Sequence, residues 1–305
     1  MKVAITGATG FVGSRLVERL QAQGHQPIVL TRNPSGAKRV FPTLEIVEYT
    51  PTESGSWQKA IAGCDAVVNL AGEPIAESRW TPQQKQEILN SRQLGTQKIV
   101  EAIAQANPKP SVLINTSAIG YYGTSETALF DETSSAGNDF LAEVCQEWEG
   151  EAQKVKAADV RLVILRFGIV LGNGGALAKM IPAFKLFAGG PLGTGRQWFS
   201  WIHRDDLVDL ILFALNRPDV EGVLNATAPN PVRMSELSQI IGETLGRPSW
   251  LPVPSFVPEL LLGEGSKVVL EGQQVLPKRT TSYGFEYHYP TVKQALAEIL
   301  ASSQG

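Results

Sequence analysis

The residues with the clearest chemical pattern lie near the start of the chain, where Thr6 to Gly13 read TGATGFVG. Gly7, Gly10 and Gly13 follow the short apolar run Val3–Ile5 and precede a helical pattern. Glycines at this spacing permit a tight turn, close approach of phosphates to backbone N–H groups, and close packing of helix on strand. Between a strand and a helix, the loop predicts binding of a dinucleotide. The competing interpretation is a glycine-rich turn without a ligand.

The end of the second predicted strand discriminates between dinucleotides. An Asp or Glu about 20 residues after the glycine loop would bind the ribose 2′-hydroxyl of NAD. This chain has Thr31 and Arg32 there, and the next acid is Glu45. The guanidinium of Arg32 suits a 2′-phosphate, and Lys38 and Arg39 follow nearby. We therefore expect NADP(H) rather than NAD(H), the alternative being that Arg32 is a solvated surface cation.

Short apolar strands alternate with longer amphipathic helices over the first two-thirds of the chain. This pattern predicts an α/β fold, a doubly wound parallel (Rossmann-type) sheet with a ligand crevice at the carboxyl ends of its strands. Glycines and prolines accumulate from Gly172 onward. We expect residues 1–171 to form the dinucleotide-binding domain and residues 172–305 a smaller substrate-binding lobe, partly interleaved with it. The expected strands are Val3–Ile5, Pro27–Leu30, Leu44–Tyr49, Ala66–Leu70, Val112–Asn115 and Leu162–Phe167.

Composition narrows the classes of function. The 305 residues carry a net charge of −3, which disfavours a nucleic-acid-binding protein. No run of about 18 apolar residues predicts a membrane span, and the first residues lack the pattern of a signal peptide, so a cytoplasmic, soluble protein is expected. Cys64 and Cys145 are too few for a disulfide framework, and no two histidines have metal-ligand spacing. We expect no metal site.

Several motifs resemble the extended, epimerase-like branch of the short-chain dehydrogenase/reductase superfamily. The loop at 6–13 is similar to the branch's TGxxGxxG, and Ser117 lies where the branch places its catalytic Ser or Thr. Further matching segments are NLAG at 69–72, NSR at 90–92 with GT at 95–96, and RFGIVLG at 166–172. The subgroup it resembles, epimerase family proteins that include cell division inhibitor and giant-chloroplast proteins, is indicated by NLAGEPI at 69–75, RW at 79–80, FLAEVCQEWE at 140–149, GPLGTGRQWFSWIHRDDL at 190–207 and LNATAP at 224–229.

The resemblance implies a set of cofactor-binding residues. The N–H groups around Gly10–Val12 would hold the pyrophosphate, Leu70 and Ala71 would line the adenine–ribose side, and Val170 would close over the nicotinamide. Glu87 and Arg92, on one helix, would lie near the cofactor. The complete set expected for NADP(H) is Gly7, Thr9, Gly10, Phe11, Val12, Gly13, Thr31, Arg32, Leu70, Ala71, Gly72, Glu87, Arg92, Ser117 and Val170.

The chain departs from this branch on the helix that should carry the general acid/base. The enzymes it resembles use a Tyr with a Lys four residues later on the same helix face, and a Ser or Thr that orients the substrate oxygen. Residues 139–148 read DFLAEVCQEW, with no Lys before Lys154. Ser117 and Tyr122 remain as catalytic candidates, because a phenol in the loop after Ser117 could reach the crevice. The alternative for Tyr122 is packing within that loop.

A second aromatic-rich segment, GRQWFSWIHRDD at 195–206, suggests a substrate site. Arg196, Trp201 and His203, together with Tyr121, are candidates for stacking on and pairing with an anionic or nucleotide-linked substrate. The same side chains could equally fill the core between the lobes.

The expected function is that of an NADP(H)-dependent oxidoreductase or epimerase-like enzyme acting on an unidentified small carbonyl or hydroxyl compound, nucleotide-linked or not. The alternative is a non-catalytic NADP(H)-binding regulator of cell or plastid division, with a partner in the division machinery. A homodimer is compatible with the resemblance, although no residue demands one.

Overall fold

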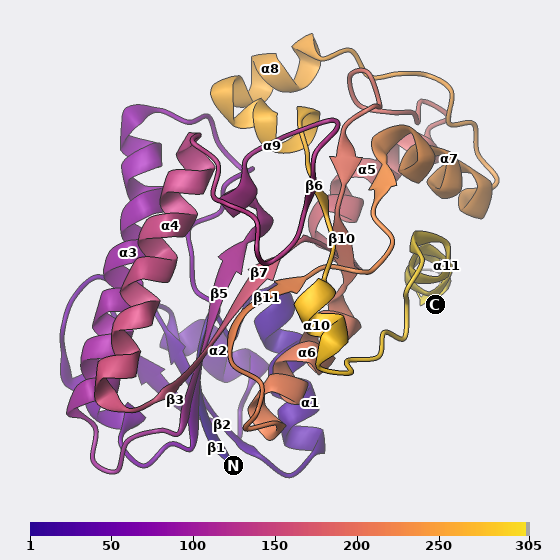
Figure 1. Cartoon of the computed structure of the whole chain (residues 1–305). Helices are drawn as coiled ribbons and strands as arrows, with labels where there is room; N and C mark the ends of the chain where they lie inside the picture. Colours follow the sequence, from indigo (N-terminus) through magenta and orange to yellow (C-terminus); the bar gives the residue numbers. More distant parts are fainter. Residues whose placement is uncertain (303–305) are drawn as a thin grey trace.

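The computed structural model describes residues 1–302, and a parallel seven-stranded sheet lies at its centre (Figure 1). Its strands follow the order β11 (Gly222–Ala226), β7 (Arg161–Phe167), β5 (Val112–Ala118), β4 (Ala66–Asn69), β1 (Lys2–Thr6), β2 (Gln26–Thr31) and β3 (Glu45–Glu48). The predicted doubly wound Rossmann-type sheet is confirmed. Its seventh strand, β11, was not expected, because five residues with a glycine and an asparagine form too weak an apolar pattern.

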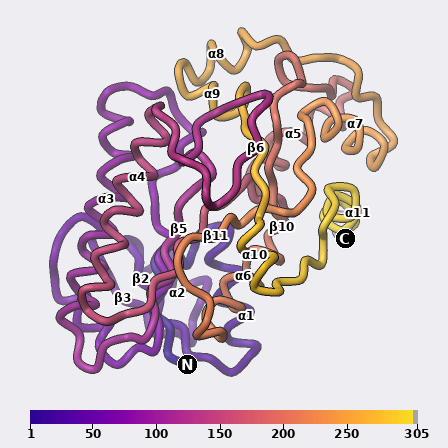
Figure 2. The backbone as a smooth tube through the Cα atoms, viewed as in Figure 1, coloured from indigo at the N-terminus to yellow at the C-terminus, as the bar shows by residue number. Residues whose placement is uncertain are grey.

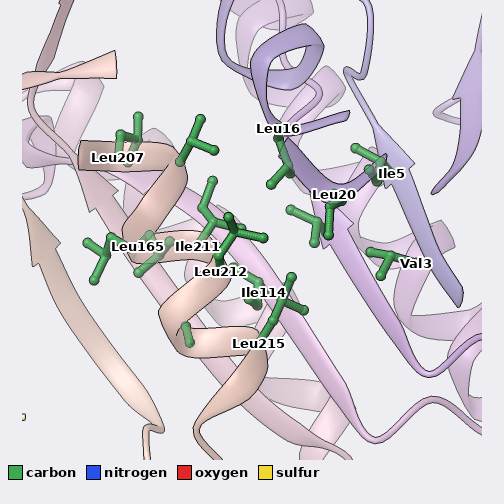
Figure 3. Packing of buried hydrophobic residues seen from close by; sticks show 14 of the residues in the cluster. Val3, Ile5, Leu16, Leu20, Ile114, Leu165, Leu207, Ile211, Leu212 and Leu215 are labelled. Carbon is green, nitrogen blue, oxygen red and sulfur yellow. The ribbon is translucent and has the colours of Figure 1, made fainter. Parts of the chain in front are cut away.

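Helices cover both faces of the sheet. On one face α1 (Phe11–Ala22) packs against α6 (Arg204–Asn216), and on the other α3 (Pro82–Gln105) packs against α4 (Phe140–Gln153) (Figures 1 and 2). Figure 3 shows the first of these layers, where Leu16 and Leu20 of α1 meet Leu207 and Ile211 of α6 above the sheet. Because neighbouring residues of a strand point to opposite faces, a sheet covered on both sides needs continuous apolar strands. The sequence of β1 meets this need.

The remaining elements lie mostly beyond the carboxyl ends of the strands (Figure 1). They form three two-stranded sheets and several short helices. The sheets are β8 (Ile169–Gly172) with β10 (Trp201–His203), β9 (Trp198–Phe199) with β12 (Val232–Arg233), and β6 (Leu129–Phe130) with β13 (Gln274–Val275). The helices are α2 (Pro34–Val40), α5 (Gly175–Lys185), α7 (Met234–Leu245), α8 (Phe256–Leu262), α9 (Lys267–Leu270), α10 (Lys278–Ser282) and α11 (Val292–Ser302). Since α6 and β11 return to the central sheet, the division of the chain at residue 171 stays a prediction.

None of the helices within residues 1–302 combines the length and the apolar character that crossing a bilayer requires.

A buried carboxylate fastens the segment before α11 to the central layer. Asp206, near the start of α6, accepts hydrogen bonds from the backbone N–H groups of His288 at 2.9 Å and Tyr289 at 3.0 Å. Burial raises the pKa of Asp206, and these two bonds act in the opposite direction. The carboxylate therefore holds an otherwise irregular stretch of backbone in place.

We predict that Asp206→Ala lowers the free energy of unfolding by about 2–4 kcal/mol, because two backbone donors lose their acceptor and a buried polar site is left empty. Urea denaturation followed by circular dichroism measures the change. The control is Asp219→Ala, which removes an exposed carboxylate and should leave the free energy of unfolding nearly unaltered, because exposed ion pairs contribute little to stability. Equal effects of the two substitutions would contradict the proposed role of Asp206.

Candidate active site

A cavity of about 770 Å³ opens where the glycine loop after β1 meets the carboxyl ends of β5 and β7. Its cofactor half is lined by the glycine loop, the Leu70–Gly72 loop, Arg92 and Ser117. Its distal half lies between the chain before α3, the start of α4 and the segment 264–273. The residues that define the distal half are Ile75, Trp80, Phe140, Trp198, Glu264, Lys267, Val268 and Glu271.

The glycine loop has the geometry of an anion cradle. Gly7 adopts a φ of +68°, and a Cβ there would lie 2.9 Å from the backbone carbon of Leu70. A Cβ on Gly13 would lie 2.1 Å from the carbonyl oxygen of Gly7. Helix α1 begins at Gly10 without a side-chain cap and without an acid in its first turn. Its first N–H groups therefore have no acceptor within the helix, and they favour a phosphate at this end of the cavity.

Buried polar side chains position the Leu70–Gly72 loop beside this cradle. The hydroxyl of Thr6 donates to Asn69 at 2.7 Å and accepts from the N–H groups of Leu70 and Ala71 at 3.1 Å. Asn69 in turn donates to Asn115 of β5 at 2.7 Å. The network joins the ends of three adjacent strands, which explains why polar residues occur where these buried strands end.

Arg92 supplies a positive charge to the cofactor half. Its Nη1 donates to the carbonyl of Ile88 at 3.1 Å and its guanidinium stacks over Trp148. Burial lowers the pKa of Arg92, and within residues 1–302 no carboxylate forms an ion pair with it. The indole Nε1 of Trp148 is also buried without a hydrogen-bond partner among these residues. The desolvated guanidinium of Arg92, beside an indole N–H that has no acceptor, favours binding of an anionic ligand.

The centre of the site is a buried network that begins at Ser117. Ser117 Oγ donates to Glu149 Oε1 at 2.6 Å, and Arg166 forms a bidentate pair with both oxygens of Glu149 at 2.8 Å each. Arg166 Nη1 also donates to the hydroxyl of Tyr122 at 3.0 Å, and that hydroxyl donates to Asn225 of β11 at 2.7 Å. Burial raises the pKa of Tyr122 to about 12. Its phenol is therefore neutral near pH 7 and engaged within the network.

Helix α4 presents Leu141 and Cys145 toward the end of β5. The Sγ of Cys145 lies 3.6 Å from the carbonyl oxygen of Ala118, and both residues line the cavity. These positions, four residues apart on one helix face, are those from which a Tyr and a Lys would reach Ser117. Burial, with the nearby charge of Glu149, raises the pKa of Cys145 to about 11. The thiol is thus neutral and supplies no positive charge in place of a Lys.

The structure brings together eleven of the residues considered from the sequence. Those that line the cavity are Gly7, Gly10, Phe11, Val12, Gly13, Leu70, Gly72, Arg92, Ser117, Tyr122 and Val170. Thr9, Thr31, Arg32 and Ala71 lie outside its lining. Thr31 is the last residue of β2, the strand next to β1, and the exposed Arg32 follows it. Glu87 is an exposed residue of α3 that accepts a hydrogen bond from Gln83.

The candidate substrate residues lie away from the cavity lining. Trp201 is fully buried in a separate apolar cluster and donates to the carbonyl of Asn230. His203 caps α6 and contacts Glu298 at 3.1 Å. Arg196 is exposed and paired with Glu126, and Tyr121 stacks on the guanidinium of Arg166. For these side chains, the alternative of a structural role agrees better with the geometry.

Comparison with known proteins identifies the family. Residues 3–226 match the profile of the NAD dependent epimerase/dehydratase family, and residues 253–299 match a domain of unknown function. The chain belongs to the NAD dependent epimerase/dehydratase family. This confirms the epimerase-like resemblance read from its motifs.

Relatives of this family member cover almost all of its length. It is 55% identical over 303 residues to the chloroplastic homolog of the epimerase family protein SDR39U1 from Arabidopsis thaliana, an alignment that spans 98% of this chain and 87% of the relative. It is 39% identical over 302 residues to the epimerase family protein YfhF of Bacillus subtilis, with 99% and 98% covered. The crystal structure of the human epimerase family protein SDR39U1 with NADPH superposes with a TM-score of 0.88 at 35% identity and covers 99% of both chains.

Glu149 and Arg166 were not among the site residues expected from the sequence. Arg166 was noted only as part of a strand motif, and Glu149 only as part of a helix motif. A signal was nevertheless present, because an arginine within an otherwise apolar strand needs a buried acid as its partner.

We predict that Glu149→Gln lowers the free energy of unfolding by about 3–5 kcal/mol, because it leaves the charge of Arg166 buried without its acid. Thermal and urea denaturation measure the loss. The double variant Glu149→Leu with Arg166→Met should recover much of it, since neither charge remains. A loss in the double variant equal to the sum of the losses in Glu149→Leu alone and Arg166→Met alone would show that the two residues are not energetically coupled. Lys154→Ala, which breaks an exposed pair with Glu151 at the end of the same helix, serves as the control.

Proposed function

We propose that this family member is an NADP(H)-dependent oxidoreductase that interconverts a small alcohol and its carbonyl compound. The observation that carries the proposal is the hydrogen bond from Ser117, which lines the cavity, to the buried carboxylate of Glu149 behind the cavity wall. Ser117 lines the same cavity as the glycine loop. A cofactor bound on that loop and a substrate oxygen at Ser117 would thus share one enclosed space.

The residues present fit a dinucleotide phosphate. The uncapped start of α1 offers N–H groups to the pyrophosphate, and Arg92 with Trp148 offers further donors in the same half of the cavity. Arg32 is exposed, forms no ion pair among the residues described and follows the carboxyl end of β2, the neighbour of β1, which supports its assignment to the adenosine 2′-phosphate. The human relative crystallised with NADPH supports the same choice. The other residues expected to hold the cofactor, from Gly7 to Val170, belong to this proposal, and Ser117 is assigned to the substrate oxygen instead of to the cofactor.

When bound, the nicotinamide would supply or accept the hydride. Side chains of the protein must accept the proton of the substrate oxygen during oxidation and return it during reduction. Because the Ser117 hydrogen points to Glu149, the lone pairs of Ser117 Oγ are free to accept a hydrogen bond from a substrate hydroxyl. During oxidation of the alcohol, its proton passes to Ser117 Oγ while the Ser117 proton moves to Glu149 Oε1, and reduction follows the reverse path. Arg166 and Tyr122 hold Glu149 in position for this transfer.

The location of the protein in the cell and its activity as an enzyme are further parts of the same proposal. The cytoplasmic location expected from the sequence is one of them. The alternative of a non-catalytic NADP(H)-binding regulator of division would be supported by tight NADPH binding without turnover in either direction.

We predict that Arg32→Glu weakens NADPH binding by about 10–100-fold and changes NADH binding by less than about threefold, because only NADPH carries the 2′-phosphate that pairs with the guanidinium. Isothermal titration calorimetry on cofactor-free protein measures both constants. Lys156→Glu makes the same change of charge on an exposed residue just before β7, at the amino ends of the strands, and should leave both constants unaltered. A parallel loss of NADPH and NADH binding in Arg32→Glu would refute the role of Arg32.

We predict that Ser117→Ala lowers the rate of NADPH oxidation with a carbonyl substrate by about 100-fold or more, because the substrate oxygen loses its proton donor. NADPH affinity should stay within about threefold, as the glycine loop is unaltered. Absorbance at 340 nm with a panel of carbonyl compounds provides the assay. Tyr121→Phe keeps the ring that covers Arg166 and is the matched control with unaltered turnover. Full activity of Ser117→Ala would rule out the proposed proton path.

A further inference from the structure

We infer that the substrate of this site is an uncharged, largely apolar carbonyl or alcohol compound, and that it is not linked to a nucleotide. The inference rests on the proposed function, because it takes the distal half of the cavity as the place of the substrate body. Three features of that half support it: its walls are apolar, most of its polar side chains already form hydrogen bonds within the protein, and it has few cations.

The walls of the distal half are aromatic and aliphatic. Trp80 and Phe140 meet edge to face with ring centroids 5.3 Å apart, and Ile75, Leu141, Trp198 and Val268 line the same space. The indole Nε1 of Trp80 donates to the carbonyl of Ile75 at 2.8 Å, and that of Trp198 donates to the carbonyl of Glu126 at 3.0 Å. Both indole donors are therefore occupied, so the two tryptophans can offer a ligand only the apolar surface of their rings.

Apart from the exposed amide of Asn138, the neutral polar side chains along the distal half are also committed to the protein. Ser200 Oγ donates to the carbonyl of Gln273 at 2.8 Å and accepts from the N–H of Val275 at 3.0 Å. The Nε2 of Gln273 donates to the carbonyl of Ile119 at 2.8 Å, and Thr124 donates to Glu271 at 2.8 Å. A sugar ring with several hydroxyl groups would lose its bonds to water here without gaining equivalent ones. An apolar ring system has no such cost.

The charge of the distal half opposes a diphosphate. The carboxylates that line it are Asp139, Glu264 and Glu271. Glu264 is paired at 2.6 Å with Lys85, whose ammonium lies over the ring of Phe140 outside the lining. Asp139 and Glu271 are left against the single ammonium of Lys267 among the described residues that line this half. The N-terminus of α4, which could otherwise attract a phosphate, is already capped by Asp139, whose Oδ1 accepts from the N–H of Ala142 at 2.9 Å. The nearby Arg233 does not line the cavity and is stacked on Trp198. A nucleoside diphosphate needs several cations or free N–H groups, and this half provides too few.

Binding to the protein saturated with NADP⁺ tests the inference, because a ketone forms a non-reacting complex with the oxidised cofactor. Isothermal titration calorimetry compares two probes, the neutral ketone 2-tetralone and the nucleotide sugar UDP-glucose. We expect 2-tetralone to bind at least tenfold more tightly than UDP-glucose. We expect Trp80→Ala to weaken 2-tetralone binding about tenfold or more, since one wall of the distal half is removed. Val268→Asp, which places a carboxylate on the apolar wall of the cavity from the short helix α9, should abolish it.

The control variant and the measurement of NADP⁺ binding separate this inference from the proposed function. Trp250→Ala removes an exposed indole outside the cavity and should leave 2-tetralone affinity unaltered. NADP⁺ binding should persist in all three variants, and its absence in the wild-type protein would refute the proposed function rather than this inference. Tighter binding of UDP-glucose than of 2-tetralone, or binding of neither to the NADP⁺ complex, would overturn the inference while the NADP(H) assignment stands.

Discussion

The site depends on one interaction, the buried bidentate pair between Arg166 of β7 and Glu149 of α4, whose side chains are 4% and 9% exposed. Burying two charges is favourable only when every remaining donor and acceptor finds a partner. Here Ser117 donates a hydrogen bond to one oxygen of Glu149. The Nη1 of Arg166, which does not bond to Glu149, donates to the hydroxyl of Tyr122. The pair therefore does more than join a strand to a helix. It sets which atom of Ser117 faces the cavity, because the Ser117 hydrogen is held by Glu149.

The loss of a Tyr and a Lys from α4 alters the character of the cavity as well as its chemistry. Leu141 and Cys145 make this wall apolar, and the neutral thiol leaves the site without an ammonium at that position. A cation is provided instead by Arg92, from the neighbouring helix α3. Positive charge has thus shifted toward the cofactor half, and the wall near the substrate oxygen retains only Ser117 as a hydrogen-bonding group from β5. The family fold can host this arrangement because α3 and α4 pack side by side on the same face of the sheet.

The parts that could be predicted from the sequence are those with local signals. The glycine loop, six of the seven sheet strands and the absence of a Tyr–Lys pair each depend on residues close together in the chain. The network around Ser117 could not be predicted in this way, because Tyr122, Glu149, Arg166 and Asn225 come from four separate elements. Trp201 and His203 illustrate the opposite problem. Aromatic and imidazole groups serve a buried core as well as a ligand site, and only the three-dimensional packing decides between these roles.

The two halves of the cavity differ in the ligand charge that they favour. In the cofactor half, the uncapped start of α1 and the unpaired Arg92 favour phosphate. In the distal half, the carboxylates of Asp139 and Glu271 face the ammonium of Lys267, and Asp139 caps the start of α4, where an anion could otherwise bind. A molecule with a diphosphate at one end can therefore occupy the cavity in only one orientation, with its phosphates on the glycine loop. In the function that we propose, the dinucleotide would therefore occupy the cofactor half, and the apolar half would be left for a neutral substrate whose oxygen reaches Ser117.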